Sequence, residues 1–216
     1  MAVQVKICGI TTAKDYLTCC DAGARWIGMV YYPGSPRHLD IGGLAQIACV
    51  ADTVSAPAPL RVLLSVNLLG DDIVPLIEAA RPDMLQLHGA ETPADVAAIK
   101  RRFGLPIIKA VAVETADDLK DCHHWEGLAD CLLFDAKVTA GAMPGGTGHS
   151  FDWSLLAGYR GSLDWMLAGG LTSQTLATAV KTSGAQALDV SSGVESAPGV
   201  KDPNQICAFI RAAQLI

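Results

Sequence analysis

Short runs of apolar residues recur along the chain, and each is followed by a longer segment in which apolar and polar positions alternate with helical spacing. A short apolar run bounded by turn-forming residues predicts a buried strand, and a longer amphipathic segment predicts a helix. Eight strands are predicted in this way, at residues 5–8, 26–30, 60–66, 84–87, 106–111, 131–135, 165–168 and 187–190.

The segments that follow these strands predict helices at residues 15–22, 43–51, 71–80, 92–104, 116–122, 153–157, 173–183 and 203–213. Gly23 and Gly104 suit the left-handed conformation that ends a helix, and Thr92 followed by Pro93 is typical of a helix start. Strict alternation of strand and helix with short connections predicts a parallel sheet, and eight such units close into a barrel.

The predicted fold class is therefore α/β, a lean, single-domain (β/α)8 TIM barrel over residues 1–216 with an abbreviated fifth helix. The main rival is an open doubly wound sheet of about five or six strands. No GxGxxG motif follows the first strand, so a dinucleotide-binding sheet has little support.

Composition narrows the classes of partner. Half of the 216 residues are hydrophobic and 18% are charged, as in a well-buried α/β protein. The formal net charge of −6 argues against general nucleic-acid binding, and no apolar run approaches the roughly 18 residues that a membrane span needs. Neither a monomer nor a homodimer is favoured by these features.

Cysteine usage and the first residues bear on the compartment. The seven cysteines are scattered and form no CxxC pair and no zinc-like cluster with histidine. The chain runs from Met1 directly into a strand without the basic and apolar regions of a signal peptide. We therefore expect a cytoplasmic protein with reduced cysteines and no metal.

Chemistry in a barrel of this kind is expected at the carboxyl ends of the strands. Cys8 ends the first strand, where a thiol is either an inert core group or a reactive one. Asp135 ends the sixth strand, where a carboxylate is either a structural cap or a general acid whose pKa burial could raise. Together they would suit proton removal and proton donation on a small substrate.

The seventh strand ends in Gly169-Gly170 and the eighth in Ser192-Gly193. Loops at these two places often hold a phosphate, because small residues let backbone N–H groups face an anion. The plainer reading is that these residues only turn the chain. A further loop at residues 145–148 reads as a third phosphate cradle or as a lid over substrate.

Several charged residues complete the candidate set. Arg37 follows the second strand and is either a binder of carboxylate or phosphate or an ordinary surface residue. Gln86 and His88 end the fourth strand, and His88 is either a partner of Cys8 or a hydrogen-bonded rim residue. Lys6 and Cys8 are two residues apart on the first strand, so both side chains face the barrel interior. A buried ammonium group needs a carboxylate partner, and we predict a buried ion pair between Lys6 and Asp189 on the adjacent eighth strand.

Seven stretches of the chain resemble phosphoribosylanthranilate isomerases, in that family's order. They are Val5-Lys6-Ile7-Cys8-Gly9-Ile10-Thr11, Tyr32-Pro33-Gly34-Ser35-Pro36-Arg37, Leu85-Gln86-Leu87-His88-Gly89, Leu133-Phe134-Asp135, Gly145-Gly146-Thr147-Gly148 with Phe151-Asp152-Trp153, Leu167-Ala168-Gly169-Gly170-Leu171, and Asp189-Val190-Ser191-Ser192-Gly193-Val194-Glu195. One departure is Ser65, where the family more often carries phenylalanine; it bears on how an aromatic ring packs there and not on the acid/base pair.

The resemblance implies a (β/α)8 barrel that catalyses an Amadori rearrangement in tryptophan biosynthesis, with no metal or cofactor. Cys8 would be the general base and Asp135 the general acid, while Arg37 would contact the anthranilate part of a phosphosugar substrate. The loops at Gly170 and at Ser192-Gly193 would hold its phosphate. Two alternatives stay open: a related phosphosugar isomerase of the histidine-biosynthesis or bifunctional type, which typically uses two aspartates, and a catalytically silent barrel that serves as a binding protein.

Overall fold

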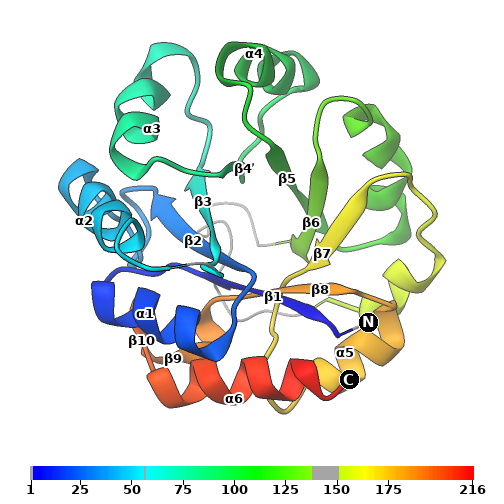
Figure 1. The fold of residues 1–216 in the computed structure, drawn as a ribbon. Helices are drawn as coiled ribbons and strands as arrows, with labels where there is room; N and C mark the ends of the chain where they lie inside the picture. Colours follow the sequence, from blue (N-terminus) through cyan, green and yellow to red (C-terminus); the bar gives the residue numbers. More distant parts are fainter. Residues whose placement is uncertain (1, 56, 138–150) are drawn as a thin grey trace.

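The computed structural model describes residues 2–55, 57–137 and 151–216. Eight parallel strands form a closed barrel in the order of the sequence, and helices surround it (Figure 1). The strands are β1 (Gln4–Cys8), β2 (Trp26–Tyr31), β3 (Leu60–Ser65), β4 (Met84–Leu87), β5 (Ile107–Val113), β6 (Cys131–Ala136), β7 (Asp164–Leu167) and β8 (Ala187–Val190). The predicted fold class is confirmed, and each predicted strand is present.

The α-helices around the barrel are α1 (Ala13–Ala22), α2 (Ile41–Ala51), α3 (Val74–Ala80), α4 (Pro93–Phe103), α5 (Leu176–Ser183) and α6 (Pro203–Gln214). Short 3-10 segments are η1 (Gly70–Ile73), η2 (Ala116–Trp125), η3 (Trp153–Gly158) and η4 (Ser192–Val194). The fifth connection, η2, carries 3-10 turns in place of an α-helix. The predicted abbreviation of the fifth helix therefore agrees with the structure, and the described part of the sixth connection carries a 3-10 segment, η3, of 6 residues against the 10 of η2.

Local signals explain most helix boundaries. Thr92 caps α4 in a capping box with Asp95, and Gly104 ends the helix at a φ of 66°. Asp40 accepts a hydrogen bond from the Gly43 N–H, so α2 begins at Ile41, two residues before the predicted start. The main apolar core lies between the outer face of the sheet and the helices. This core packs the helices against the strands of the barrel.

The barrel interior is layered. Buried apolar side chains from β3, β5, β6 and β7 fill the lower part, among them Val62, Ile108 and Leu133. Above them Lys6 pairs with Asp189, with Nζ and Oδ1 2.8 Å apart and both side chains buried. Register explains the pair, because β1 and β8 place these two residues side by side. The predicted ion pair is confirmed.

A small antiparallel hairpin follows β8, formed by β9 (Glu195–Ala197) and β10 (Val200–Lys201). It lies between η4 and α6 and had no counterpart among the predicted elements. Gly199, in its turn, has a φ of 81° and packs so closely against the Pro36 carbonyl that a side chain would collide with it. The hairpin is thereby joined to the loop that follows β2.

Candidate active site

A pocket opens at the carboxyl ends of the strands. Chemically active side chains reach it from four parts of the barrel: Cys8 from β1, Arg37 from the loop after β2, His88 from the loop after β4, and Asp135 from β6. The rest of the wall consists of Val30, Tyr32, Leu64 and Val66 together with the polar Ser35, Asp189 and Ser191. The structure therefore brings together four of the predicted site residues.

Ser65 lies between two residues that line the pocket, Leu64 and Val66. Side chains alternate along a strand, so the buried Ser65 faces away from the pocket. Its hydroxyl is without a hydrogen-bond partner among the described residues. An aromatic ring at this position would pack behind the sheet, and the departure from the family pattern does not alter the wall of the pocket.

Cys8 is a buried thiol beside a buried ammonium group. Burial raises its pKa above the ordinary value, while the positive charges of Lys6 and Lys201 oppose that increase. A Cβ at Gly28 would stand 2.9 Å from the Cys8 Sγ and 3.2 Å from the Lys6 Nζ. Only glycine leaves room here, because any side chain would press on both groups. Sequence reasoning missed Gly28, whose sole signal is a glycine inside an apolar strand.

Asp135 and His88 face each other across the pocket mouth. The Oδ2 of Asp135 lies 3.5 Å from the Nε2 of His88, and its Oδ1 accepts a 2.8 Å hydrogen bond from the Ala136 N–H. The His88 Nδ1 lies 2.7 Å from the Gln86 Nε2. Gln86 is fully buried and contacts His88 beneath the pocket without lining it. We therefore place Gln86 in support of His88.

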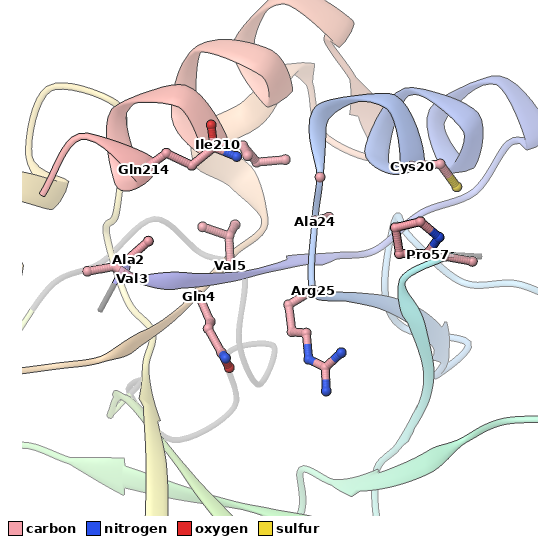
Figure 2. A pocket seen from close by; sticks show the side chains of 12 residues that line it. Ala2, Val3, Gln4, Val5, Cys20, Ala24, Arg25, Pro57, Ile210 and Gln214 are labelled. Carbon is pink, nitrogen blue, oxygen red and sulfur yellow. The ribbon is translucent and has the colours of Figure 1, made fainter.

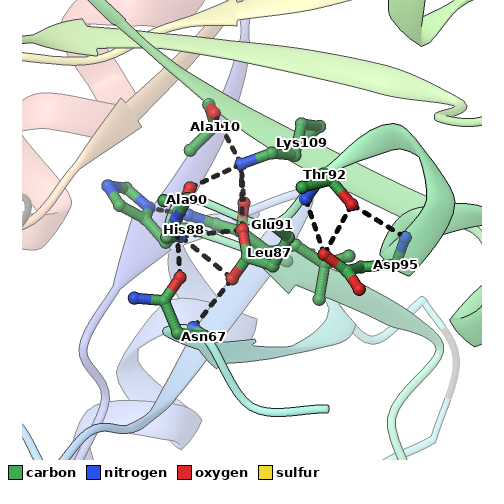
Figure 3. Close-up of polar contacts among 11 residues, drawn as sticks. Asn67, Leu87, His88, Ala90, Glu91, Thr92, Asp95, Lys109 and Ala110 are labelled. Carbon is green, nitrogen blue, oxygen red and sulfur yellow. Dashed lines mark hydrogen bonds and ion pairs between the residues drawn. The ribbon is translucent and has the colours of Figure 1, made fainter.

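A buried polar cluster holds the loop that carries His88 (Figure 3). Lys109 donates hydrogen bonds to the carbonyls of Leu87 and Gly89 and pairs with Glu91 at 3.0 Å. The Glu91 carboxylate accepts hydrogen bonds from the N–H groups of Gly89 and Asn67, so it ties the loop after β4 to the end of β3. Neither charged residue was predicted to have a role, although a lysine within an apolar strand was a usable signal.

The two glycine-bearing loops lie against each other. Gly169 and Gly170 adopt φ values of 87° and 67°, which favour glycine. Gly193 packs onto the Leu171 carbonyl so tightly that no side chain would fit, and Ser192 begins η4 beside it. This arrangement suits an anion held between both loops, and the phosphate assignment stays a prediction. The third loop, residues 145–148, lies outside the described residues.

Arg37 is a buried residue and not an ordinary surface one, with 4% of its area exposed. Its Nε and Nη2 each lie 2.7 Å from the Glu195 carboxylate oxygens. Lys201 approaches the same carboxylate to 2.6 Å and also donates to the Ser191 carbonyl. Sequence reasoning missed Glu195 and Lys201. Two opposite charges flanking a Pro-Gly turn were the signal for a charged cross-strand pair.

A larger hollow of about 420 Å³ lies at the opposite end of the barrel, between β1, α1 and α6 (Figure 2). Its lining is mostly apolar, with Gln4, Arg25 and Gln214 as its polar side chains beside Cys20. Among the described residues, no group of three or more histidine, cysteine or carboxylate side chains could hold a metal ion. No helix in the described part is long and apolar enough to cross a membrane.

The fold and the upper pocket define a (β/α)8-barrel protein with a thiol and a carboxylate in one pocket. The family model described as N-(5'phosphoribosyl)anthranilate (PRA) isomerase matches residues 5–212. The chain therefore belongs to the N-(5'-phosphoribosyl)anthranilate isomerase family.

Individual relatives of the chain support this family assignment. An N-(5'-phosphoribosyl)anthranilate isomerase from Cereibacter sphaeroides is 46% identical over 213 residues, which cover 98% of this chain and 99% of the relative. The solved phosphoribosyl anthranilate isomerase from Thermotoga maritima matches with a TM-score of 0.86 and 32% identity, covering 99% of this chain and all of that one. Another solved phosphoribosyl anthranilate isomerase is in complex with reduced 1-(o-carboxyphenylamino)-1-deoxyribulose 5-phosphate. It matches with a TM-score of 0.83 and 32% identity, covering 99% of this chain and all of that one.

Proposed function

We propose that this chain converts N-(5'-phosphoribosyl)anthranilate to 1-(2-carboxyphenylamino)-1-deoxyribulose 5-phosphate, with Cys8 as general base and Asp135 as general acid. The observation that carries the proposal is that these two residues, from β1 and β6, line one pocket in a member of this isomerase family. Cys8 also argues against the histidine-biosynthesis type, where two aspartates are typical. Residues 1–216 would form one catalytic domain.

The first step is assigned to Asp135 in its protonated form. Its Oδ1 accepts from the Ala136 N–H, so the acidic proton belongs on Oδ2. Transfer of that proton to the furanose ring oxygen breaks the C1'–O bond, and the nitrogen lone pair forms the C1'=N bond of an iminium ion. His88, 3.5 Å from Oδ2, then stabilises the carboxylate that remains.

The second step is assigned to Cys8 in its thiolate form. The thiolate takes the proton from C2', and the C2'–H electrons form a double bond to C1' while the iminium nitrogen becomes neutral. The resulting enolamine tautomerises to the ketone. Burial raises the pKa of Cys8, and the Asp189 carboxylate raises it further. The thiolate would therefore depend on the Lys6 ammonium and on the positive charge of the iminium. That charge acidifies C2' and removes any need for a metal.

Substrate contacts follow from the same pocket. Arg37 lines it and would face the anthranilate carboxylate, because a guanidinium group suits planar anions. The paired loops at Gly169-Gly170 and Ser192-Gly193 would hold the 5-phosphate. All seven cysteines are free, which fits a reducing compartment, and we propose a cytoplasmic location.

The test is loss of phosphoribosylanthranilate fluorescence when the purified protein is added. We expect turnover by the parent chain, and a decrease of about 10²–10⁴-fold in kcat for Cys8→Ala and for Asp135→Asn. Inorganic phosphate and sulfate should compete with substrate through the two loops. Near-parental rates in both variants would overturn the mechanism, and absence of turnover by the parent chain would overturn the activity.

A further inference from the structure

The hairpin of β9 and β10 carries a carboxylate that pairs with Arg37 and a lysine that pairs with the same carboxylate. Glu195 begins β9 and Lys201 ends β10, and both are buried. The Glu195 carboxylate accepts hydrogen bonds from the Nε and Nη2 of Arg37, each at 2.7 Å. A forked pair of this kind fixes the plane of a guanidinium group as well as its position.

Backbone contacts fix the same group from other sides. The Gly199 N–H donates to the second oxygen of Glu195 at 3.3 Å, and Gly199 packs on the carbonyl of Pro36, the residue before Arg37. Gly9, next to Cys8, leaves room for the aliphatic part of the Arg37 side chain, where any larger residue would collide. The hairpin, the arginine and the catalytic strand therefore form one packed unit.

Charges in this unit do not balance. Among the described residues, Arg37 and Lys201 are both cationic and share the carboxylate of Glu195, so the formal charge of these three buried side chains is positive. Lys201 also donates to the carbonyl of Ser191, whose hydroxyl donates to the Cys8 carbonyl at 3.0 Å. An excess buried cation is costly unless an anion meets it. Such an excess at a pocket suits an anionic ligand.

We propose that Glu195 is a positioning residue for recognition of the substrate's aromatic carboxylate. It holds the Arg37 guanidinium in the orientation that this carboxylate needs, and Lys201 keeps Glu195 from cancelling the arginine's charge. The inference rests on the proposed function and deepens it, since it assigns carboxylate selectivity to a hairpin outside the eight βα units. Phosphate recognition is assigned elsewhere, to the paired glycine-bearing loops.

The test compares three stable probes by calorimetric titration. They are reduced 1-(2-carboxyphenylamino)-1-deoxyribulose 5-phosphate, the same compound without its carboxylate, and ribose 5-phosphate. In Glu195→Gln the amide keeps one acceptor, but its NH₂ group opposes an N–H of Arg37. We expect the ratio of Kd values between the probes with and without the carboxylate to fall by about tenfold, and KM to rise more than kcat falls. The affinity for ribose 5-phosphate should not change.

Two controls isolate the effect. Asp130→Asn makes the same carboxylate-to-amide change at the amino end of β6, where Asp130 pairs with Lys100, and should keep the parental Kd ratio. In an Arg37→Lys background, Glu195→Gln should change the ratio no further, because the positioned group is gone. If Glu195→Gln does not fold, Glu195→Asp takes its place, since the shorter side chain keeps the charge but draws back from the guanidinium.

The outcomes separate the two proposals. An equal loss of affinity for all three probes, or an unchanged ratio in folded Glu195→Gln, would overturn the role of Glu195. In either case turnover by the parent chain would still support the isomerase activity. Absence of turnover by the parent chain, with tight and Glu195-dependent binding of the carboxylated probe, would overturn the activity while supporting the positioning role.

Discussion

Lys6→Met separates the structural role of the buried charge layer from its chemical role. The single substitution leaves the Asp189 carboxylate buried without its partner at 2.8 Å. Breaking a buried pair in this way typically costs about 3–5 kcal/mol of the free energy of unfolding. In the double variant Lys6→Met/Asp189→Asn both charges are gone, and most of that stability should return, because neutral replacement of a buried pair is often tolerated.

Activity should not return with stability. The Lys6 Nζ and the Cys8 Sγ lie 3.2 and 2.9 Å from one point, the place of a Cβ at Gly28. A cation within about 4–6 Å lowers the pKa of an acid by about 1–3 pH units. Asp189 acts in the opposite direction on Cys8, and less strongly. The double variant should therefore lose at least about tenfold in kcat/KM at neutral pH, the lower end of that range.

Urea unfolding and the fluorescence assay across pH 6–9 measure the two effects in the same samples. The matched control is Lys100→Met/Asp130→Asn, which neutralises an exposed pair at the opposite end of the barrel. It should keep both the rate and the pH profile. A folded Lys6→Met/Asp189→Asn protein with parental kcat/KM and an unchanged pH profile would show that Lys6 does not support the thiolate.

Four further predictions follow from buried groups. Lys109→Met leaves Glu91 unpaired and should cost about 3–5 kcal/mol of unfolding free energy in a urea titration, a loss that Glu91→Gln in the same chain should largely restore. Gly28→Ala should lower kcat by at least about tenfold, because the added methyl group displaces the Cys8 thiol, while the far-UV circular dichroism spectrum should stay unchanged. A parental kcat would show that the methyl group does not displace the thiol. Burial raises the pKa of Cys8, so its thiolate fraction grows with pH. In Asp135→Asn, which lacks the second titrating group of the proposed mechanism, the residual kcat/KM should therefore increase about tenfold per pH unit from neutrality until Cys8 is ionised, and a flat profile in this variant would contradict the role of Cys8 as base. Ser65→Ala removes a buried unpartnered hydroxyl and should raise stability by about 1 kcal/mol, and a loss of stability would point to a partner for that hydroxyl.

The barrel and its buried ion pair could be predicted because both depend on periodicity. Each strand is a short apolar run, and the inward alternation of Lys6 with Cys8 demanded a carboxylate on a neighbouring strand. Closure of eight units makes β8 that neighbour, and Asp189 is its inward acidic residue. The same reasoning applied to Lys109 on β5 would have led to a search for Glu91, which lies in a loop and has no strand register to mark it.

The rest could not be predicted because it depends on contacts between segments far apart in the sequence. Nothing near Arg37 indicates that Glu195, 158 residues away, will bind it. The 3-10 turns of η2 carry the polarity of a weak helix, and no local signal decides between the two hydrogen-bond patterns. Gly28 reads as an ordinary strand glycine until the positions of Cys8 and Lys6 on β1 are known. Packing against a neighbouring strand gave it a role.

The charges around Cys8 indicate the order of the two proton transfers. In the described part of the chain Lys6 is matched by Asp189, and Glu195 is shared by Arg37 and Lys201, so these five side chains carry a net positive charge on the Arg37 side. When the substrate carboxylate meets that charge, the pocket becomes neutral and burial again favours the neutral thiol. In the proposed mechanism the iminium then adds its positive charge to that of Lys6 in stabilising the thiolate, and the iminium would form only after Asp135 had protonated the ring oxygen. Acid catalysis should therefore precede base catalysis, and an Asp135→Asn protein should bind the substrate with its ring closed and exchange no deuterium into C2'.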